Sequence, residues 1–576
     1  TMEENTTLNL GSNSTTGVNR DSDHALNYYG NITLATNATL NVGSGTTVDG
    51  IISGDTNARG TLNVLGNFTH DRTIGTSSIA TTTSILSLEE INISEGNTFT
   101  MSKNVTTTRM DINGTVTAEG NITAAITMGN DGILNLNTLT NASGTQAANV
   151  TGVIQSGVID TNQGTLSING TWGTSAEIGT GGRGLDAIYL GANGNSTSAF
   201  TTTFGHSVNA TTITLGTATS SLNSTLVIQS DVRGVNTVIT GDIVGGGNSS
   251  STDNKAGGRL LISGNATVTG SIGISGGRLA DIRIEDGGLL TLTGSGKNIY
   301  ANNITMLSDE KVDGLGNATL AFNGTGTTNI YGIISGESTE GEGRIDINAG
   351  TVIFNNALGT STNYISAINV ATGSTMTTSS NIFANSTIKI LGKLDVNSAI
   401  TITVNDANSD GGGLQIGNTV GNNGTLETSG TITLSSNTTA WGNPSTIHSF
   451  NNATIKLNGT HSAHGSTGSG YVEIGGNNQT LVIQGNTTVD LDLTNTVITD
   501  GGTIVIVGRG SESNSNGTLK ISGNVTMTQY QFLTITSNNS TFTSGAENLS
   551  DDSFNATVTY RSSSSMGFTG NTKTVY

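Results

Sequence analysis

Hydrophobic and polar positions alternate in short runs along this chain, and Gly or Asn bounds most of the runs. The commonest run opens with Thr and continues with an apolar, a polar and a second apolar residue, as in Thr39–Val42, Thr61–Val64 and Thr518–Ile521. Alternation with a period of two is typical of a half-buried strand, and the bounding residues are typical of turns. Because the run recurs from one end of the chain to the other, the sequence predicts a repeat architecture rather than a globular domain with one active site.

The spacing between copies of the run indicates the kind of repeat. The central apolar residues of successive copies lie roughly 30 residues apart, which suits one coil built of three short strands and three turns. On this reading Leu320 follows Leu290 by one coil, Val352 follows Leu320, and Leu481 follows Ile455. We therefore expect an all-β fold, a right-handed parallel β-helix (β-solenoid) of roughly 19 coils, with the handedness taken from the commonest solenoids of this coil length.

The two ends of the chain differ from its middle. The first segment carries unusual charge and the last holds a raised share of the aromatic residues. Because the bare end of a solenoid exposes strand edges, end coils are expected to be atypical. We expect residues 1–30 to form an N-terminal cap or assembly segment, residues 31–530 the solenoid, and residues 531–576 a C-terminal cap or assembly segment.

Composition supports a folded, thin stack of small cores. The chain of 576 residues is 33% hydrophobic and contains 81 Gly but a single Pro, which argues against a Pro-rich flexible stalk. It has no Cys, so disulfides and thiolate metal sites are excluded. No stretch is long and apolar enough for a membrane helix, so we expect no membrane insertion by this chain. Thr1 in place of an initiator Met suggests a chain from which an export signal has been removed.

Charge narrows the range of partners. The formal net charge is −20, from 41 acidic against 21 basic residues, and the sequence has no basic stripe that would neutralise phosphates. Nucleic acid and anionic membranes are therefore disfavoured as partners. Only 11% of the residues are charged, so the surface is expected to consist mainly of hydroxyls and amides. Cations and polar glycans suit such a surface better.

Two stretches, Gly326–Gly336 and Gly350–Asn356, resemble the passenger domains of bacterial autotransporters, in particular the large rickettsial-type surface-layer antigens. The resemblance is one of repeat style. It covers most of the chain and does not include the C-terminal translocator domain of those families. It implies a β-solenoid displayed at a cell surface, with a role in layer formation or adhesion.

Asn-X-Ser/Thr sequons are abundant, and most of them use Thr. They predict N-glycosylation of an extracellular coat. The alternative is that Asn closes a turn and Thr opens the next strand, which produces the same pattern without any sugar. The candidates at such turn-to-strand junctions are Asn37, Asn121, Asn265, Asn317, Asn452 and Asn524.

Calcium is the one cofactor for which the sequence offers a pattern. Asp406, Asn408 and Asp410, followed by Gly411, match the first half of a calcium loop, in which oxygen ligands alternate and Gly allows the sharp turn. Gly417 stands where a bidentate acid would complete the loop, so an ordinary Asx-rich turn is the alternative. The segment Gly181–Tyr189 fits one copy of a calcium-binding nonapeptide, a motif that works only in tandem.

The sequence offers little catalytic chemistry. His461 and His464 lie three residues apart without a third ligand nearby, which favours a solvated loop over a zinc site. A β-helix polysaccharide-degrading enzyme would need carboxylates on one groove. The acidic pair Glu89–Glu90 is adjacent in sequence, and in a regular strand its two side chains would point to opposite faces. We therefore expect no enzyme. An ice-binding face would need strictly regular Thr ranks, which the uneven spacing disfavours.

These observations together predict an extracellular structural protein at the cell surface. The leading hypothesis is a self-assembling coat, as a surface-layer or filament subunit whose main partner is a second copy of itself. An autotransporter-type adhesin that binds cell-surface glycans or host receptors is the runner-up. The polysaccharide-degrading enzyme is the alternative from a different class.

Overall fold

A computed structural model of the chain shows strands and turns without helices in the described residues. The structure describes residues 1–10, 26–28, 30–75, 86–137, 147–174, 177–191, 200–216, 224–230, 235–246, 257–307, 318–338, 341–404, 414–417 and 424–428, and beyond these the backbone of separate strands between 432 and 561. The chain divides into two compact units, Thr1–Ile282 and Arg283–Tyr576. We call them the N-terminal and C-terminal units and describe each by itself.

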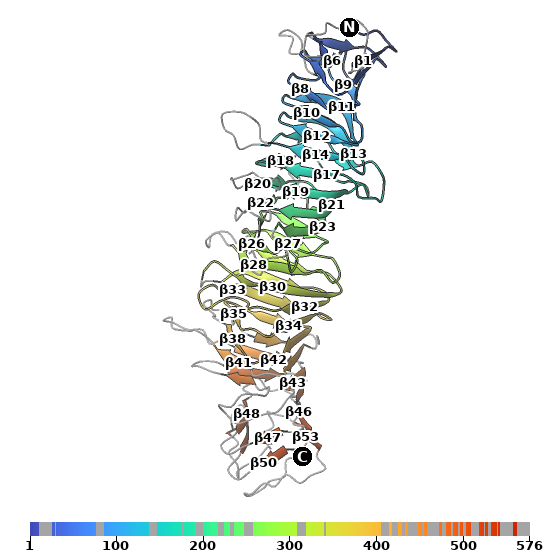
Figure 1. Cartoon of the computed structure of the whole chain (residues 1–576). Helices are drawn as coiled ribbons and strands as arrows, with labels where there is room; N and C mark the ends of the chain where they lie inside the picture. The colour runs from blue at the N-terminus through green and yellow to red at the C-terminus, as the bar shows by residue number, and fades with distance from the viewer. Residues whose placement is uncertain are drawn as a thin grey trace. The chain divides into compact units, whose positions relative to one another are not determined.

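The N-terminal unit is a stack of coils whose strands pair in parallel with the strands one coil away (Figure 1). Its first sheet contains β1 (Thr7–Leu10), β4 (Thr39–Val42), β7 (Thr61–Val64), β9 (Leu88–Ile93), β11 (Val105–Ile112), β13 (Ile122–Met128), β15 (Val150–Thr151) and β16 (Ile154–Ser156). The register is direct, and Thr39, Leu40, Asn41 and Val42 lie opposite Thr61, Leu62, Asn63 and Val64.

Further strands of this unit line the other faces of the coils. One series consists of β2 (Leu26–Tyr28), β5 (Thr46–Val48), β8 (Phe68–His70), β10 (Thr98–Met101), β12 (Thr115–Ala118), β14 (Ile133–Leu136), β17 (Thr165–Ile168), β19 (Leu185–Leu190), β21 (Val208–Leu215), β23 (Thr237–Gly245) and β25 (Asn265–Val268). Another consists of β18 (Trp172–Thr174), β20 (Thr201–Phe204), β22 (Thr225–Ile228) and β24 (Arg259–Ile262), and β3 (Ile32–Leu34) pairs with β6 (Ile52–Gly54). β26 (Leu279–Ile284) spans the boundary between the units.

The C-terminal unit repeats the same arrangement. One series runs through β27 (Leu289–Leu292), β29 (Thr319–Phe322), β31 (Glu342–Ile347), β33 (Ile365–Val370), β36 (Ile388–Ile390), β39 (Leu414–Ile416), β42 (Ile447–Asn451) and β45 (Thr480–Gln484). A second runs through β28 (Ile299–Met306), β30 (Thr327–Ser335), β32 (Thr351–Phe354), β34 (Thr375–Thr378), β37 (Lys393–Val396), β40 (Thr425–Thr428), β43 (Thr454–Leu457), β46 (Thr488–Asp492), β49 (Thr518–Ser522) and β53 (Thr557–Arg561). A third contains β35 (Ile382–Ala384), β38 (Ile400–Val404), β41 (Ile432–Ser435) and β44 (Val472–Ile474).

Five short strands complete the C-terminal unit. They are β47 (Thr496–Ile498) with β50 (Val525–Met527), and β48 (Thr503–Val507) with β51 (Phe532–Ser537) and β52 (Ser540–Thr541). Parallel pairing therefore reaches into both terminal segments, since β1 pairs with β4 and β53 with β49. That these segments act as caps or assembly surfaces stays a prediction.

The core is a set of continuous apolar columns, one residue from each coil. Leu40, Leu62, Ile91 and Met110 follow one another in register in the first sheet, and all are fully buried. Each coil buries few side chains, and stacking joins them into a core that no coil could form alone. The predicted all-β parallel solenoid is confirmed. The alternation is confirmed as well, because Leu40 of β4 and Leu62 of β7 are buried, whereas the Thr that opens each strand faces outward.

The coils are more uneven than the spacing of the runs predicted. Leu320 does lie opposite Leu290, as expected. The next residue in that column is Ile345, however, and Val352 lies in a different sheet, opposite Thr328. The prediction that Val352 follows Leu320 by one coil is therefore wrong, because strands on different faces use the same run of residues.

The same error affects the later copies. Ile455 lies opposite Val489, whereas Leu481 lies opposite His448 in another series of strands. The spacing of about 30 residues was therefore measured between strands that belong to different faces of the coils.

Candidate interaction surface

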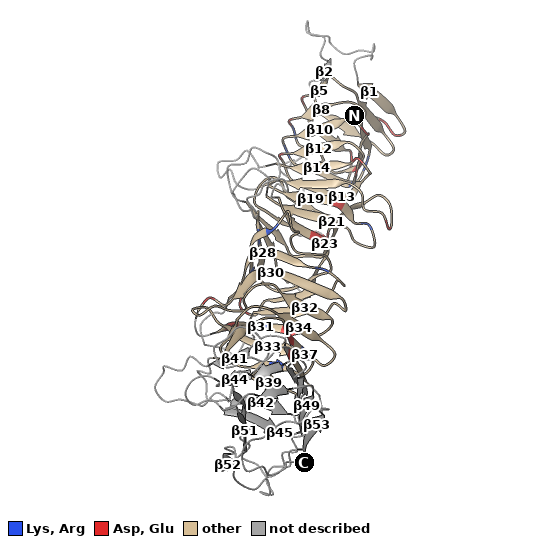
Figure 2. Cartoon of the chain, turned by 60° about the horizontal axis from the view of Figure 1, so that its bottom comes forward, with Lys and Arg blue, Asp and Glu red and all other residues tan. Residues whose placement is uncertain are grey.

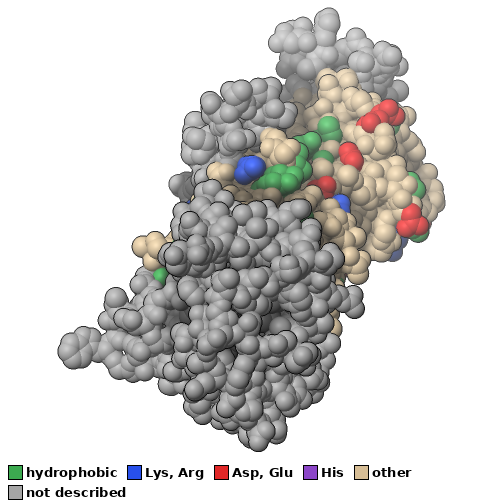
Figure 3. Space-filling model, turned by 90° about the horizontal axis from the view of Figure 1, so that it is seen from below, with side chains coloured by type: hydrophobic (Ala, Val, Ile, Leu, Met, Phe, Trp, Pro, Cys, Tyr) green, Lys and Arg blue, Asp and Glu red, His purple; other side chains and the backbone are tan. Residues whose placement is uncertain are grey.

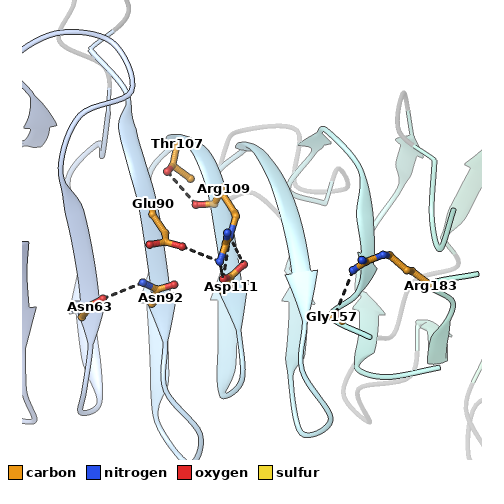
Figure 4. Close-up of polar contacts among 8 residues, drawn as sticks. All are labelled: Asn63, Glu90, Asn92, Thr107, Arg109, Asp111, Gly157 and Arg183. Carbon is orange, nitrogen blue, oxygen red and sulfur yellow. Dashed lines mark hydrogen bonds and ion pairs between the residues drawn. The ribbon is translucent and has the colours of Figure 1, made fainter. Parts of the chain in front are cut away.

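An amide ladder runs along the outer side of the first sheet. Asn41 Nδ2 donates to Asn9 Oδ1 at 2.6 Å, and Asn63 Nδ2 to Asn41 Oδ1 at 2.8 Å. Asn92 Nδ2 continues the ladder to Asn63 Oδ1 at 3.0 Å (Figure 4). Parallel in-register pairing places identical side chains about 4.8 Å apart, a separation at which each amide can bond to the next. The side chains therefore join four successive coils, and they share one direction of donation.

An ionic cluster follows the amides in the same sheet. Asp111 takes the register position after Asn92, and the Arg109 guanidinium bonds to the Asp111 carboxylate and lies 2.9 Å from Glu90 Oε1 (Figure 4). The hydrogen bond to Asp111 raises the pKa of Arg109, with the negative charges of Asp111 and Glu90 acting in the same direction and burial opposing them. Because the Arg109 side chain is 55% exposed, solvent weakens these pairs, and we assign them to coil alignment rather than catalysis.

Glu89 and Glu90 correct a prediction from the sequence. Glu89 is exposed and Glu90 is half-buried, so both point outward rather than to opposite faces. The strand is irregular here, since the backbone N–H groups of both residues point to the carbonyl oxygen of Gly60. Two residues thus stand between the buried Leu88 and Ile91 where a regular strand has one.

Threonine columns occupy outward positions in both units. Thr47, Thr69, Thr100 and Thr117 follow one another in the N-terminal unit, and none of them is buried. Thr327, Thr351 and Thr375 do the same in the C-terminal unit. Charged residues are sparse along the ribbon (Figure 2), and the acidic side chains on the face seen in Figure 3 lie apart from one another. The described surface is therefore mainly a periodic array of hydroxyls and amides.

A loop after β16 presents two apolar side chains to solvent. Val158 is 49% and Ile159 is 55% exposed. Ser156 fixes the conformation of the loop, because its Oγ donates to the carbonyl oxygens of Val158 and Thr161 at 3.0 and 2.8 Å. Two apolar side chains are thus exposed on a loop that hydrogen bonds hold in one conformation.

The next coil also fixes this loop, which we call the Val158 loop (residues 157–163). Arg183 Nη1 donates to the carbonyl oxygen of Gly157 at 3.2 Å (Figure 4), and the Asp160 N–H donates to the carbonyl oxygen of Gly182 at 2.7 Å. The segment Gly181–Tyr189, a possible calcium motif in sequence, therefore forms a turn that supports its neighbour and then enters β19. Sequence reasoning missed the Val158 loop, although two apolar residues directly after Gly157 were visible.

The sequon Asn residues connect coils through their side-chain oxygens. Asn104 Oδ1 accepts from the backbone N–H of Asn121 at 3.0 Å, and Asn121 Oδ1 accepts from that of Asn149 at 2.9 Å. Asn67 Oδ1 accepts from the Thr98 N–H in the same way, at 3.0 Å. At these three junctions the side-chain oxygen has a structural role, and the Nδ2 atom that would carry a glycan takes no part in the bond.

Of the predicted glycosylation sites, Asn37 and Asn121 are exposed and Asn265 is half-buried. Asn37 has a left-handed backbone (φ 55°) and donates from Nδ2 to Asn5 Oδ1 at 3.0 Å. The remaining predicted residues lie outside the described part of the chain. They are Asn317, Asn452 and Asn524, the calcium candidates Asp406, Asn408 and Asp410, and His461 and His464. Within the described residues, no group of three or more His, Asp or Glu side chains is placed to hold a metal ion.

Lys393 belongs to an ionic group of the C-terminal unit. Its Nζ lies 2.7 Å from Glu427 Oε2 and 3.7 Å from Asp395 Oδ2. Burial lowers the pKa of Lys393, but the hydrogen bonds and charges of Glu427 and Asp395 outweigh burial, and the net shift is upward. The lysine thus bridges two carboxylates that register places in neighbouring coils, and its single positive charge reduces the repulsion between them.

One titratable side chain lies inside the core. His70, the last residue of β8, is fully buried and stacks on Phe68 with ring centroids 5.7 Å apart. Among the described contacts neither ring nitrogen of His70 has a hydrogen-bond partner. Burial lowers the pKa of His70. The backbone groups of Val48 and Thr73, which do not reach hydrogen-bond geometry with the ring, and the charge of Asp71 oppose this shift without cancelling it. The core around His70 therefore favours the neutral imidazole.

Comparisons with known proteins identify no relative of this chain: no family model, no curated protein and no solved structure matches it. No helix among the described residues is both long and apolar enough to cross a membrane. The fold and its surface chemistry are therefore the basis for any functional proposal.

Proposed function

We propose that this chain is an extracellular structural protein, the subunit of a self-assembling cell-surface coat. The observation that carries the proposal is the periodic outer surface, in which columns such as Thr47, Thr69, Thr100 and Thr117 present the same group at each coil. A periodic polar array suits lateral packing against the same array on another copy, because one matching contact brings the following ones into register. The repeat-style resemblance to autotransporter passenger domains, the rickettsial-type surface-layer antigens among them, supports the same role.

Electron microscopy of the purified chain tests the proposal. We expect ordered sheets or filaments in negative stain. Isolated particles over a wide range of protein concentration would overturn the coat. Calcium is the cofactor we propose for assembly, and chelation should then dissolve the arrays, with loss of the effect in a variant that replaces Asp406 and Asp410 by Asn.

Intact mass of the protein from its natural source tests the proposed glycans separately. A mass equal to that of the bare polypeptide, to which residues 1–576 contribute 58.4 kDa, would show that the sequons serve the turns alone. A large excess that deglycosylation removes would show a glycosylated coat. Either mass is compatible with assembly, so this measurement decides the surface chemistry and not the architecture.

An adhesin is the second candidate, and the Val158 loop favours it specifically. A fixed loop with two exposed aliphatic side chains can bind a receptor at little entropic cost. Replacing Val158 and Ile159 by Ser should then abolish binding to host or neighbouring cells. Leu65, which is 53% exposed and lies outside this loop, supplies the matched control through Leu65→Ser. Equal binding by both variants would overturn the adhesin proposal. A separate assay with acidic polysaccharides tests the enzyme alternative, which cleavage of the polysaccharide would favour.

A further inference from the structure

Two tyrosine side chains stack on the outer side of the C-terminal unit. Tyr300 of β28 and Tyr331 of β30 lie opposite each other in these neighbouring parallel strands (Figure 1). Their ring centroids are 4.4 Å apart, and the angle between the ring planes is 14°. Both side chains are half-buried, so part of each ring is accessible to solvent. The fold therefore holds two phenol rings face to face at its surface.

The positions before each tyrosine fix this pair in register. Ile299 and Ile330 lie opposite each other and are fully buried, so the next residue on each strand faces outward. Asn298 Oδ1 accepts from the backbone N–H of Asn329 at 2.9 Å and from its Nδ2 at 3.0 Å. The sequence Asn-Ile-Tyr thus occurs in both coils, 31 residues apart, and its two copies bond to each other. The strands that carry the rings therefore align them.

Phenol rings in this arrangement are placed for oxidative coupling. Loss of one electron and of the hydroxyl proton converts a tyrosine to a phenoxyl radical, whose unpaired electron is shared with the ring carbons ortho to the oxygen. The orbitals that hold this electron stand perpendicular to the ring, and those of Tyr300 and Tyr331 face each other across the stack. Because the fold supplies the alignment in advance, coupling of two such radicals becomes an intramolecular step. The chain also contains no Cys thiol that could reduce such a radical within the molecule.

We propose that Tyr300 and Tyr331 are a modification site, at which a peroxide-dependent one-electron oxidant joins two neighbouring coils through a dityrosine. One carbon–carbon bond forms between ring carbons ortho to the two hydroxyl groups, and the hydrogen atom on each of these carbons moves to the phenolic oxygen. The pair loses two electrons and two protons in total, and hydrogen peroxide takes them up to form two molecules of water. The bond closes the chain between residues 300 and 331 into a loop, which restricts the unfolded state. The site does not depend on the proposed self-assembly.

Peptide mapping tests the site after the purified chain has been treated with a peroxidase and hydrogen peroxide. Trypsin separates the two tyrosines once the protein is denatured, because it cleaves after Lys297, Lys311 and Arg344. We expect a linked pair of the peptides 298–311 and 312–344, whose mass is the sum of the two less two hydrogen atoms. Its yield should stay constant over a dilution series, because both rings belong to one molecule.

Phenylalanine variants identify the two reacting rings. Tyr300→Phe and Tyr331→Phe keep an aromatic ring at each position but remove the phenol, so each should abolish the linked pair. Tyr189 is 36% exposed and lies in register with Ser167 and Thr214, so neither neighbouring position holds a second tyrosine. Tyr189→Phe is the matched control and should leave the yield unchanged.

Thermal unfolding supplies a second measurement. The treated protein should unfold at a higher temperature than the untreated protein, because the link restricts the unfolded chain. An equal rise in Tyr331→Phe would contradict a stabilising role of the link. Absence of the linked pair would overturn the proposal, and coupling of Tyr189 between copies in the same sample would show that the oxidant was active. A yield that falls with dilution would show coupling between molecules and would overturn the proposal too.

Discussion

Acid should weaken the N-terminal unit through His70, and the sign follows from the burial of its ring. Burial lowers the pKa of His70 in the folded protein below the ordinary value of 6.5. The unfolded chain then binds the proton more readily, so protonation favours unfolding. Stability is therefore full at pH values above 6.5 and falls as the pH decreases from there toward the folded-state pKa. Each pH unit in that window costs about 1.4 kcal/mol.

Substitution of His70 gives a second estimate of the effect of its imidazole on the free energy of unfolding, independent of pH. His70 is fully buried beside Phe68, and neither ring nitrogen has a partner in the described structure. An unsatisfied buried polar group costs about 1–3 kcal/mol, and a change to a hydrophobic residue of similar volume costs less than about 1.5 kcal/mol in packing. His70→Leu should therefore be neutral to stabilising at neutral pH, which is unusual for a substitution at a fully buried position.

Thermal unfolding followed by circular dichroism at about pH 7.5 and about pH 5.5 tests both points. For wild type we expect the N-terminal transition to fall further than in His70→Leu, by roughly 2–4 °C for each kcal/mol that the lower pH costs. The control is Ile74→Val, at a buried position of the same unit, which removes no titratable group and should keep the wild-type pH dependence. An equal loss of stability in wild type and His70→Leu would refute the reasoning.

Two further predictions concern the junctions between coils. Asn121→Ala leaves the Asn149 N–H without its acceptor and should destabilise the neighbouring coils by about 1–2 kcal/mol, as urea unfolding would show. Thr123→Val removes the same sequon and keeps the bond, so equal destabilisation by both variants would contradict the structural role of Asn121. Gly50→Ala would place a Cβ 1.9 Å from the carbonyl oxygen of Gly30 in the preceding coil. We expect this clash to lower the free energy of unfolding by about 1–3 kcal/mol or more, as thermal unfolding would show. At Gly173 a Cβ meets nothing within 4 Å, so Gly173→Ala should be near neutral, and similar losses in both Gly variants would count against the close approach.

The sequence predicted the class of fold well because the alternation and the turn residues report local conformation. Runs such as Thr39–Val42 are strands with the expected buried and outward positions. It could not assign strands to faces, since Thr319–Phe322 and Thr351–Phe354 carry the same kind of run but belong to different sheets. Backbone pairing is set by the length of each turn, and nothing in a single strand records that length.

The surface was predictable in its composition but not in its contacts. Sequence reasoning singled out Asn121 for glycosylation, and the structure shows its oxygen bonded to the next coil. The motif Asn-X-Thr predicts a turn followed by a strand. The coil that packs against this turn comes from a later part of the sequence, so the motif does not identify the bonding partner of the Asn. For the same reason the irregular strand at Glu89 and Glu90 was not foreseen, because it depends on pairing with Gly60.

In the amide ladder of the first sheet, the side chains in the middle are already engaged by their neighbours. Asn41 and Asn63 each donate to one coil and accept from another, and this limits what they can offer to a partner. The Val158 loop differs, because Val158 and Ile159 expose their side chains where the chain leaves the stack. If recognition by this chain depended instead on the amide ladder, substitutions at Asn63 would impair partner binding more than those at Ile159, and the reverse order is the one we expect.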